Sequence, residues 1–390
     1  MTAPDRLTLP DDHLGLYLHV PFCVRKCAYC DFASGPLGAD PALADRYLDA
    51  LEVEIARRRA EVTRPARSIY LGGGTPTALS GAQLRRLWRA IEALPRQANA
   101  EVSIEANPGT LNADVMDALA AMPLTRVSVG AQSLHAAELV ALGRIHAPEE
   151  VAAAAAAARG LGAQVSLDLM YGLPGQTPAT WAATLRDALA LMPEHLSLYA
   201  LIVEEGTPLA AGVAAGDVAL PGEEDEAAME AIAAARLAEA GYAYYEVSNA
   251  ARPGRHCRHN LGYWLGREYL GFGPSAVSAV GTLRWRNTPD AAGYARRAAR
   301  GQPVVCYSER LRARDHLLER VMLGLRLRGG FSLADTERAC GARLADVAGA
   351  ALARAEAAGL LERDGETLRL TPAGFPLANL VMARLMAEAA

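Results

Sequence analysis

Three closely spaced cysteines are the side chains of this sequence best suited to do chemistry. Cys23, Cys27 and Cys30 form a C-x3-C-x2-C cluster that directly follows an apolar run at residues 16–20. Three thiolates are one short of the four-cysteine cage that usually holds a [4Fe–4S] cluster, so such a cluster would keep one iron free. An amino acid can chelate that iron through its amine and carboxylate. The spacing therefore predicts an iron–sulfur site with an open coordination position.

A zinc site and a disulfide are the alternatives for these cysteines. Zinc needs a fourth Cys or His nearby, and C-x3-C is looser than the C-x2-C knuckle of zinc ribbons. His19 is close in sequence but lies within the apolar run. A disulfide is disfavoured because the chain has only 6 cysteines in 390 residues and lacks a recognisable secretion signal.

Length and composition indicate a soluble globular protein. A chain of 390 residues has room for one large domain and a small one. Its 51% hydrophobic and 21% charged residues are ordinary, and a net charge of −5 gives no global nucleic-acid footprint. Residues 1–6 lack an apolar signal region, and no apolar run approaches the ~18 residues that span a bilayer. We therefore expect a cytoplasmic protein without a transmembrane segment that does not bind nucleic acid.

The chain from residue 16 to residue 200 alternates between strand and helix patterns. The predicted strands are residues 16–20, 68–71, 102–105, 126–130, 165–170 and 195–200. The predicted helices between them are residues 42–60, 81–93, 113–121, 148–159 and 178–191. This alternation predicts βαβ units around a parallel sheet, and six units give a barrel or an incomplete barrel.

Polar residues and glycines lie at or just after one end of each of these predicted strands. They are, in strand order, Cys23, the run Gly72-Gly73-Gly74-Thr75, Glu105, Gln132, Asp168 and Tyr199. In parallel α/β barrels the carboxyl ends of the strands form the active face. We therefore expect these residues to share one site.

The pattern changes after residue 220. Residues 223–240 are predicted to form a helix and 242–248 a seventh strand, followed by an irregular stretch at 250–288. From residue 306 we expect helices at 311–327, from Ser332 and at 344–358, then a hairpin at 359–370 with Asp364-Gly365 as its turn. The expected division is therefore a core barrel at 1–220, its completion at 221–305, and a small winged-helix-like α+β domain at 306–390.

Winged helices often bind DNA, so the charge of this last segment matters. Residues 306–390 contain 12 arginines and 11 acidic residues, which is too neutral for a phosphate-binding face. We expect a packing or partner-contact role instead. Cys306 and Cys340 have no partner signature and are predicted to be buried apolar residues.

The cysteine loop and the glycine run together resemble the radical S-adenosylmethionine (SAM) superfamily. The glycines allow close backbone approach to a ligand, and the run lacks the G-K-[ST] ending of a phosphate loop. The resemblance implies an α/β fold with a partial (β/α) TIM-like barrel, a [4Fe–4S] cluster on the three cysteines and a SAM site. The implied SAM-site residues are Tyr17, Tyr29, Gly73, Gly74, Thr75, Glu105, Gln132, Arg144, Asp168 and Ala200.

Four of these residues have chemistry that suits SAM. The resemblance implies that the Glu105 carboxylate accepts hydrogen bonds from the ribose hydroxyls of SAM. It also implies that Gln132 and Arg144 bind the ribose and the methionine carboxylate, which suits the two-pronged guanidinium of an arginine. Asp168 is an acid inside an apolar strand. Because an unpaired buried acid is costly, we expect it to contact a ligand or a salt-bridge partner.

Longer motifs narrow the resemblance to the coproporphyrinogen dehydrogenase (HemN) family over nearly the whole chain. They are residues 18–23, 72–77, 130–133 and 168–176. The family has an enzyme branch, the oxygen-independent coproporphyrinogen III dehydrogenases, and a HemW-type branch of haem chaperones. The enzyme branch has a further cysteine two residues after the third, where this chain has Phe32, and a longer extension than the 16 residues that precede Tyr17. The chaperone branch carries an H-N-x-x-Y-W motif, which is present here at residues 259–264.

The resemblance therefore implies a haem chaperone that binds haem and transfers it to acceptor haem proteins. In this family the expected acceptors are respiratory haem proteins. A homodimer is compatible with the resemblance. Coproporphyrinogen dehydrogenase activity is the disfavoured alternative. The implied haem-site residues are His259, Asn260, Tyr263 and Trp264. Imidazole is a common haem-iron ligand, and Tyr and Trp offer flat faces to a porphyrin. His256 and Cys257 are alternative ligands.

Overall fold

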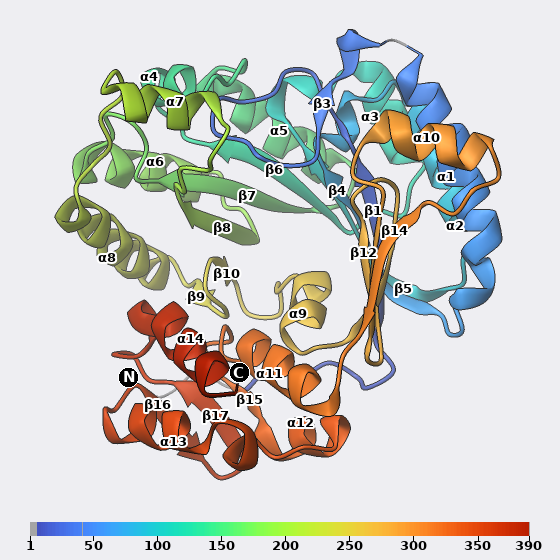
Figure 1. Cartoon of the computed structure of the whole chain (residues 1–390). Coiled ribbons are helices and arrows are strands. Elements are labelled where there is room, and N and C mark those ends of the chain that lie inside the picture. The colour runs from blue at the N-terminus through green and yellow to red at the C-terminus, as the bar shows by residue number, and fades with distance from the viewer. Residues whose placement is uncertain (1–5, 41, 390) are drawn as a thin grey trace.

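The computed structural model describes residues 6–40 and 42–389 (Figure 1). Residues 1–5, which carry most of the argument against a secretory signal, lie outside the described residues. Among the helices described, none combines the length and the apolar character needed to cross a membrane.

A curved sheet of 12 strands forms the large part of the molecule (Figure 1). Its order is β14-β13-β12-β11-β1-β4-β5-β6-β7-β8-β10-β9. The seven strands from β11 to β8 are parallel, and both ends of the sheet continue with antiparallel strands. The parallel strands are β1 (Leu14–Val20), β4 (Ala66–Gly73), β5 (Arg96–Ala106), β6 (Arg126–Gln132), β7 (Gln164–Tyr171), β8 (His195–Ala200) and β11 (Glu268–Phe272).

The six strands predicted from residue 16 to residue 200 are confirmed. These strands are apolar and buried almost throughout, as in β1 and β6, because helices cover one face and the interior of the curved sheet lies on the other. The end strands β14 and β9 are not paired with each other in the described part of the chain, so the sheet is an incomplete barrel.

The predicted seventh strand at residues 242–248 is wrong. This segment contains only the short β9 (Ala243–Tyr244), and the chain then reverses into β10 (Asn249–Ala251), antiparallel to β8. The reversal is held by the Glu246 carboxylate, which accepts the Ser248 N–H at 3.0 Å. The seventh parallel strand is β11, which pairs with β1 at the other side of the sheet.

Helices flank the sheet and pack on one another, with α10, α1, α2 and α3 in one series and α6 beside α8. The predicted helices of this region are confirmed within one to two residues at each end. The confirmed helices are α1 (Leu43–Arg58), α2 (Gly81–Glu92), α3 (Ala113–Ala120), α5 (Pro148–Gly160), α6 (Pro178–Ala190) and α8 (Glu223–Glu239). Three further helices were not predicted: α4 (Ala136–Ala141), α7 (Pro208–Ala215) and α10 (Ala291–Ala299). A short separate pair, β2 (Phe22–Cys23) and β3 (Gly35–Pro36), flanks the cysteine loop.

The stretch predicted to be irregular, residues 250–288, is instead regular. Besides β10 and β11 it contains α9 (Arg258–Trp264), β12 (Val277–Val280) and β13 (Leu283–Asn287). The strand β14 (Val305–Arg310) pairs with β13, so residues 306–310 belong to the large sheet and not to the C-terminal domain expected from residue 306. Cys306 is exposed on this edge strand, contrary to its predicted burial, whereas Cys340 is buried.

The C-terminal domain has the predicted order of helices followed by a hairpin. Its elements are α11 (Ala313–Gly324), β15 (Phe331–Ser332), α12 (Leu333–Cys340), α13 (Leu344–Ala357), β16 (Leu361–Asp364), β17 (Thr367–Leu370) and α14 (Ala378–Ala389). The hairpin turn is Gly365-Glu366, one residue later than predicted, with Gly365 at a φ of +58°. The domain has its own apolar core, built from residues such as Leu317, Leu344 and Leu368.

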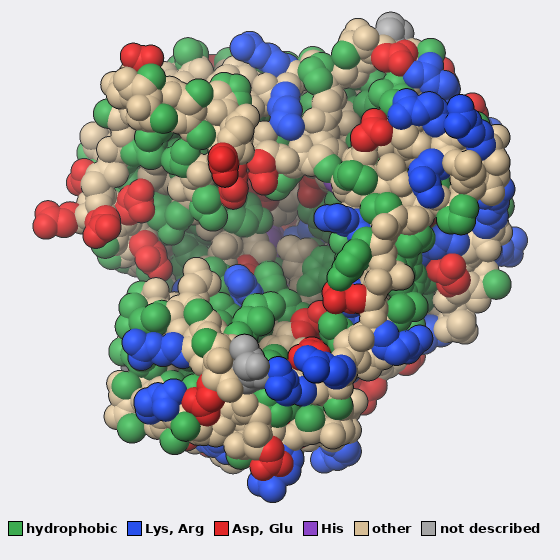
Figure 2. Space-filling view, in the orientation of Figure 1, with side chains coloured by type: hydrophobic (Ala, Val, Ile, Leu, Met, Phe, Trp, Pro, Cys, Tyr) green, Lys and Arg blue, Asp and Glu red, His purple; other side chains and the backbone are tan. Residues whose placement is uncertain are grey.

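The concave side of the sheet is hollowed (Figure 2). The opening faces the viewer between the sheet above and the C-terminal domain below, with α9 lying between them (Figure 1). The carboxyl ends of the parallel strands and the motif helix α9 therefore border the same opening.

Candidate functional site

A cavity of about 340 Å³ lies at the carboxyl ends of β4 to β8 and beneath the cysteine loop. The predicted residues that line it are Cys23, Cys27, Cys30, Tyr29, Gly73, Gly74, Thr75, Glu105, Gln132, Arg144, Asp168, Ala200 and Asn260. Tyr17, Tyr263 and Trp264 line a second hollow instead, and His259 is buried behind it. The structure therefore divides the predicted residues between two places.

The three cysteines all line this first cavity. Within the described residues, no three Cys, His, Asp or Glu side chains are placed to hold a single metal ion. Three ligands of one zinc ion would each lie about 2.3 Å from it, whereas a [4Fe–4S] cluster takes one thiolate per iron and needs a wider arrangement. Three cysteine thiols on one loop are the donor set that a [4Fe–4S] cluster with one open iron site takes, and all six cysteines of the chain are free thiols in this structure.

Polar donors contact two of the thiols. Thr75 Oγ1 lies 3.7 Å from Cys23 Sγ, and Arg144 Nη1 lies 3.5 Å from Cys27 Sγ. Hydrogen bonds to sulfur and a nearby cation stabilise thiolate charge and tune a cluster's potential. Cys23 and Cys27 thus each have a polar partner close to the sulfur atom.

The glycine run brings backbone close to the cysteine strand. A Cβ on Gly74 would lie 2.5 Å from the Phe22 carbonyl oxygen, and Gly73 has a φ of +115°. The Thr75 N–H donates to the Phe22 carbonyl at 2.6 Å. Only glycine fits these two positions, so the run holds backbone groups against the cavity where a side chain would clash.

Two carboxylates lie in the interior of the first cavity. Glu105 accepts hydrogen bonds from the Tyr70 hydroxyl and the Gly73 N–H, both at 3.0 Å, and Asp168 accepts one from Ser128 Oγ at 3.1 Å. Burial, reinforced by the Asp168 charge, raises the pKa of Glu105 to about 7. Burial also raises the pKa of Asp168 to about 6, against the lowering effect of its serine hydrogen bonds. The pair is poised to interact with polar hydroxyl or cationic groups of a ligand.

Arg144 joins the cysteine loop to the strand ends. Its Nη2 donates to Asn107 Oδ1 at 2.9 Å and to the Gly130 carbonyl at 2.5 Å, while its Nε is buried with no partner among the described residues. Gln132, at the end of β6, has a φ of +64°, a strained conformation for a residue other than glycine. Strain at a cavity wall is typical of a residue held for binding.

Sequence reasoning missed Arg126 and Tyr70 as lining residues of this cavity. Arg126 is buried at the start of β6, and its Nε and Nη1 have no hydrogen-bond partner in the described residues. The signal in the sequence was an arginine that opens an apolar strand, the same kind of anomaly that marked Asp168. Tyr70 gave no signal, because a tyrosine is ordinary in a strand.

The helix α9 presents the H-N-x-x-Y-W residues in different directions. His259 is 2% exposed, and both of its ring nitrogens are engaged, Nδ1 with Ser68 Oγ at 3.0 Å and Nε2 with the Tyr263 hydroxyl at 2.9 Å. Burial lowers the pKa of His259 to about 3, so the ring is neutral. The Asn260 side chain lines the first cavity, and Tyr263 and Trp264 line the second hollow.

The alternative ligands His256 and Cys257 lie elsewhere. Cys257 is buried with its Sγ 3.6 Å from Glu101 Oε1, and burial raises the pKa of its thiol to about 12. The His256 ring packs edge-on against Tyr245 at 4.8 Å between centroids. Cys257 borders the first cavity, and neither residue lines the second hollow.

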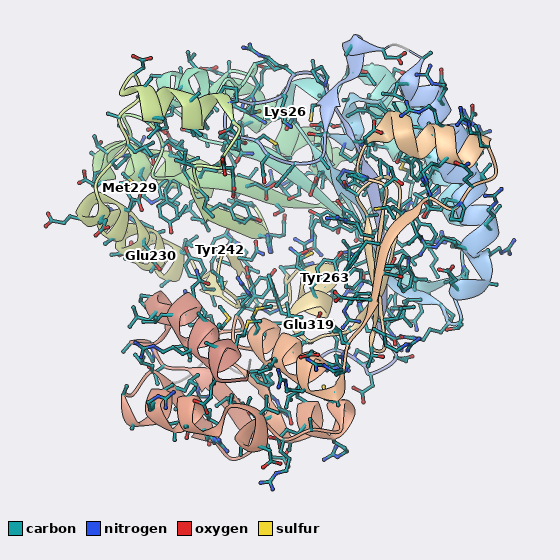
Figure 3. All side chains as sticks on the ribbon, viewed as in Figure 1. Lys26, Met229, Glu230, Tyr242, Tyr263 and Glu319 are labelled. Atoms are coloured by element: carbon teal, nitrogen blue, oxygen red, sulfur yellow. The ribbon has the colours of Figure 1, made fainter. Side chains whose placement is uncertain are left out.

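The second hollow, of about 830 Å³, lies between α9, α11 and the antiparallel strands at the β14 end of the sheet. Tyr263 on α9 and Glu319 on α11 are labelled at this place in Figure 3. The Tyr263 ring packs edge-on against Tyr269, with 4.6 Å between centroids. Sequence reasoning did not identify this hollow, because strands β12 to β14 were not recognised.

Known proteins resemble this chain over nearly its full length. The radical SAM superfamily profile matches residues 17–188, and the HemN C-terminal domain profile matches residues 311–377. A protein of Mycobacterium tuberculosis named "Heme chaperone HemW" is 39% identical over 98% of this chain and 97% of its own length. A Bacillus subtilis protein of the same name is 34% identical over 95% of this chain and 99% of its own length.

Among solved structures, coproporphyrinogen III oxidase (HemN) from Escherichia coli, a radical SAM enzyme, is similar over 97% of this chain and 91% of that chain. The TM-score is 0.84 and the sequence identity 26%. The incomplete barrel and the C-terminal domain therefore form a radical SAM fold of the HemN type.

Proposed function

The chain belongs to the HemW family of radical SAM proteins, and on this premise we propose that it is a haem chaperone, which binds haem and passes it to acceptor haem proteins. The observation that carries the proposal is the 39% identity over nearly the full length of both chains to a protein named for this role. Phe32 stands where the dehydrogenase branch has its further cysteine, and its side chain is 63% exposed at the first cavity.

The first cavity is assigned to the cluster and SAM. Cys23, Cys27 and Cys30 hold a [4Fe–4S] cluster, which when reduced supplies the electron that radical SAM chemistry requires. The backbone at Gly73, Gly74 and Thr75 receives the methionine amine of SAM. The remaining SAM contacts are assigned to Tyr29, Glu105, Gln132, Arg144, Asp168 and Ala200, all of which line this cavity.

Tyr17 is the one predicted SAM-site residue without support from this placement. It lines the second hollow, and its hydroxyl contacts His19 Nδ1 at 3.0 Å. Its ring also stacks on that of Tyr70, which lines the first cavity, with 6.3 Å between centroids, so a contact between Tyr17 and SAM stays a prediction.

The motif helix α9 is assigned to haem, through His259, Asn260, Tyr263 and Trp264. The implied role of His259 as iron ligand requires that one ring nitrogen release Ser68 or Tyr263. The alternative role is to hold Tyr263 through its hydroxyl. These two roles predict different spectra, which the experiment below separates.

The test is an anaerobic titration of the cluster-loaded protein with haem, followed by transfer to an apo-haem protein. We expect saturation near one haem per chain and transfer to the acceptor. In His259→Ala, a shifted Soret band identifies His259 as the ligand, whereas weaker binding with an unchanged band identifies it as the support of Tyr263. Absence of specific haem binding by the wild-type protein would contradict the proposed function.

Oxygen-independent coproporphyrinogen III dehydrogenase is the second candidate, favoured by the TM-score of 0.84 to the E. coli enzyme. Its test is turnover of coproporphyrinogen by the cluster-loaded protein with SAM and a reductant, for which we expect no product.

We further propose that the protein works in the cytoplasm, that its acceptors include respiratory haem proteins, and that it assembles as a homodimer. Sizing chromatography with and without the cluster tests the last of these.

A further inference from the structure

We propose that haem binds in the second hollow, against the open face of the β11–β14 ribbon, and not in the cluster cavity. This inference rests on the proposed function and names the place where its ligand is held. The hollow has a volume of about 830 Å³, within the range of small-molecule and cofactor sites.

The strand register builds a continuous wall for this hollow. Val277, Arg286 and Tyr307 are cross-strand neighbours on β12, β13 and β14. Two residues along, Tyr269, Ala279, Arg284 and Glu309 form a second row across β11 to β14. Because side chains alternate along a strand, both rows project from the same face, and all seven residues line the hollow.

The opposite face of the ribbon packs against α1 at strands β12 and β13. Ser278 is fully buried there, with its Oγ 3.3 Å from Arg58 Nη2. The Arg58 guanidinium also lies 5.4 Å from the centre of the Trp285 ring. At β12 and β13 this face therefore packs against α1, whereas the residues of the Arg286 face line the hollow.

The lining suits a flat apolar ring that carries carboxylates. Tyr263 and Trp264 of α9 and Tyr269 of β11 are only partly buried, and Val277 and Tyr307 are 38% and 50% exposed. Aromatic and aliphatic surface left open in a hollow is a typical lining for a porphyrin face. Ala279, in the second row of the wall, and Gly281, in the turn between β12 and β13, carry no bulky side chain and leave room for it.

The charges at the hollow leave one arginine available. Arg284 is paired with Glu319, Glu268 with Arg64 and Arg267 with Asp11. Arg286 is exposed on the same face and forms no ion pair among the described residues. Its guanidinium fork is free to bind a propionate carboxylate. Glu309 also lines the hollow and forms no ion pair in the described part of the chain.

The first cavity offers less room for haem. Its volume of about 340 Å³ has to accommodate the cluster and SAM, and its interior contains Glu105 and Asp168, which would repel propionates. The motif helix separates the two spaces, with Asn260 toward the cluster and Tyr263 and Trp264 toward the second hollow. Haem at the second hollow therefore touches the motif without displacing SAM.

The experiment is a titration of cluster-loaded protein with ferric haem, monitored at the Soret band, with and without saturating SAM. The test variants are Arg286→Glu and Val277→Asp, both at exposed or partly exposed strand positions that leave the core intact. The matched control is Arg310→Glu, the same charge reversal on β14 at a position whose side chain projects from the opposite face. We expect each test variant to raise the Kd for haem about ten-fold, and the control to change it less than two-fold.

The haem titrations distinguish the second hollow from the first cavity as the haem site. Weaker binding in both test variants but not in Arg310→Glu, with an unchanged Kd in the presence of SAM, supports haem at the second hollow. Normal binding in both test variants, or displacement of haem by SAM, overturns this inference and leaves the chaperone function standing. Failure of the wild-type protein to bind haem overturns the proposed function itself.

Discussion

At the scale of single residues, Glu105 and Asp168 carry a cost that a ligand relieves. Burial and mutual repulsion raise the pKa of Glu105 to about 7 and burial raises that of Asp168 to about 6. Both groups are charged in the cell only against this penalty. Buried carboxylates with raised pKa values are typical of binding sites, where they lower the stability of the folded protein but serve a ligand.

This penalty predicts the effect of Glu105→Gln. The folded-state pKa lies above the ordinary value of 4.5, so the folded chain binds a proton more tightly than the unfolded chain, and stability falls as pH rises from 4.5 through 7. We expect the substitution to raise the free energy of unfolding at pH 8 by about 2 kcal/mol and to flatten its dependence on pH. Urea unfolding of the cluster-free protein at pH 5.5 and pH 8 measures this.

The matched control is Glu239→Gln, an exposed glutamate paired only with Arg236 on the surface of α8. Its stability should change little at either pH. In the same Glu105 variant, SAM affinity of the cluster-loaded protein should fall about ten-fold, as expected for loss of one charged hydrogen-bond acceptor. An unaltered pH profile would show that Glu105 ionises normally.

At the scale of elements, the placement of α9 depends on one side chain from β5. Glu101 is 5% exposed, and its carboxylate accepts the N–H groups of Arg258 at 3.1 Å and His259 at 3.0 Å at the helix start. It also lies 3.8 Å from the buried Arg126. A carboxylate at a helix N-terminus stabilises the unpaired N–H groups there. The sheet thus fixes the motif helix directly.

We predict that Glu101→Ala lowers the free energy of unfolding by about 3 kcal/mol, because it leaves Arg126 without its acidic partner and α9 without its cap. Glu101→Gln, which keeps one acceptor oxygen, should lose less. Chemical denaturation of the three proteins gives the comparison. Asp114→Ala, whose carboxylate accepts the Gly81 N–H from a largely exposed position, is the control and should cost about 1 kcal/mol or less. Equal losses in Glu101→Ala and Asp114→Ala would contradict the assignment.

At the scale of the whole molecule, a buried acid ties the β11–β14 ribbon to the first helix. Glu54 of α1 is 3% exposed and accepts hydrogen bonds from Asn287 Nδ2 at 2.7 Å, the Gly273 N–H at 2.8 Å and the Tyr294 hydroxyl at 2.6 Å. It also pairs with Arg58 at 2.6 Å. One carboxylate therefore holds together segments more than 200 residues apart in the chain.

We predict that Glu54→Ala costs about 4 kcal/mol and loosens the ribbon, because it leaves several buried donors and Arg58 without an acceptor. Hydrogen exchange should accelerate across β11 to β14 more than across β5 to β7. Glu52→Ala, on the exposed side of the same helix and paired with Arg86, should cost less than about 1 kcal/mol and leave exchange unchanged. Uniform acceleration over the whole sheet would indicate global destabilisation instead of a local tie.

The sequence by itself determined the parallel core and the cluster cavity. The cysteines come after β1, the glycine run is at the end of β4, and Glu105 and Asp168 lie near the ends of β5 and β7. Parallel strands place such ends together. Local spacing in the sequence was enough to predict this site, because its residues lie at the ends of strands that follow one another along the chain. The same locality predicted the helices and hairpin of the C-terminal domain.

Only the tertiary structure decided how the rest of the chain is used. Strand β11 pairs with β1, some 250 residues earlier, and β12 to β14 extend that edge, which no local pattern indicates because antiparallel pairing across short, partly polar strands leaves a weak periodicity. The H-N-x-x-Y-W motif was visible in the sequence. The position of its helix α9 between the first cavity and the second hollow follows from contacts with Glu101 and Ser68. The direction of each motif side chain is a property of those long-range contacts and not of the motif.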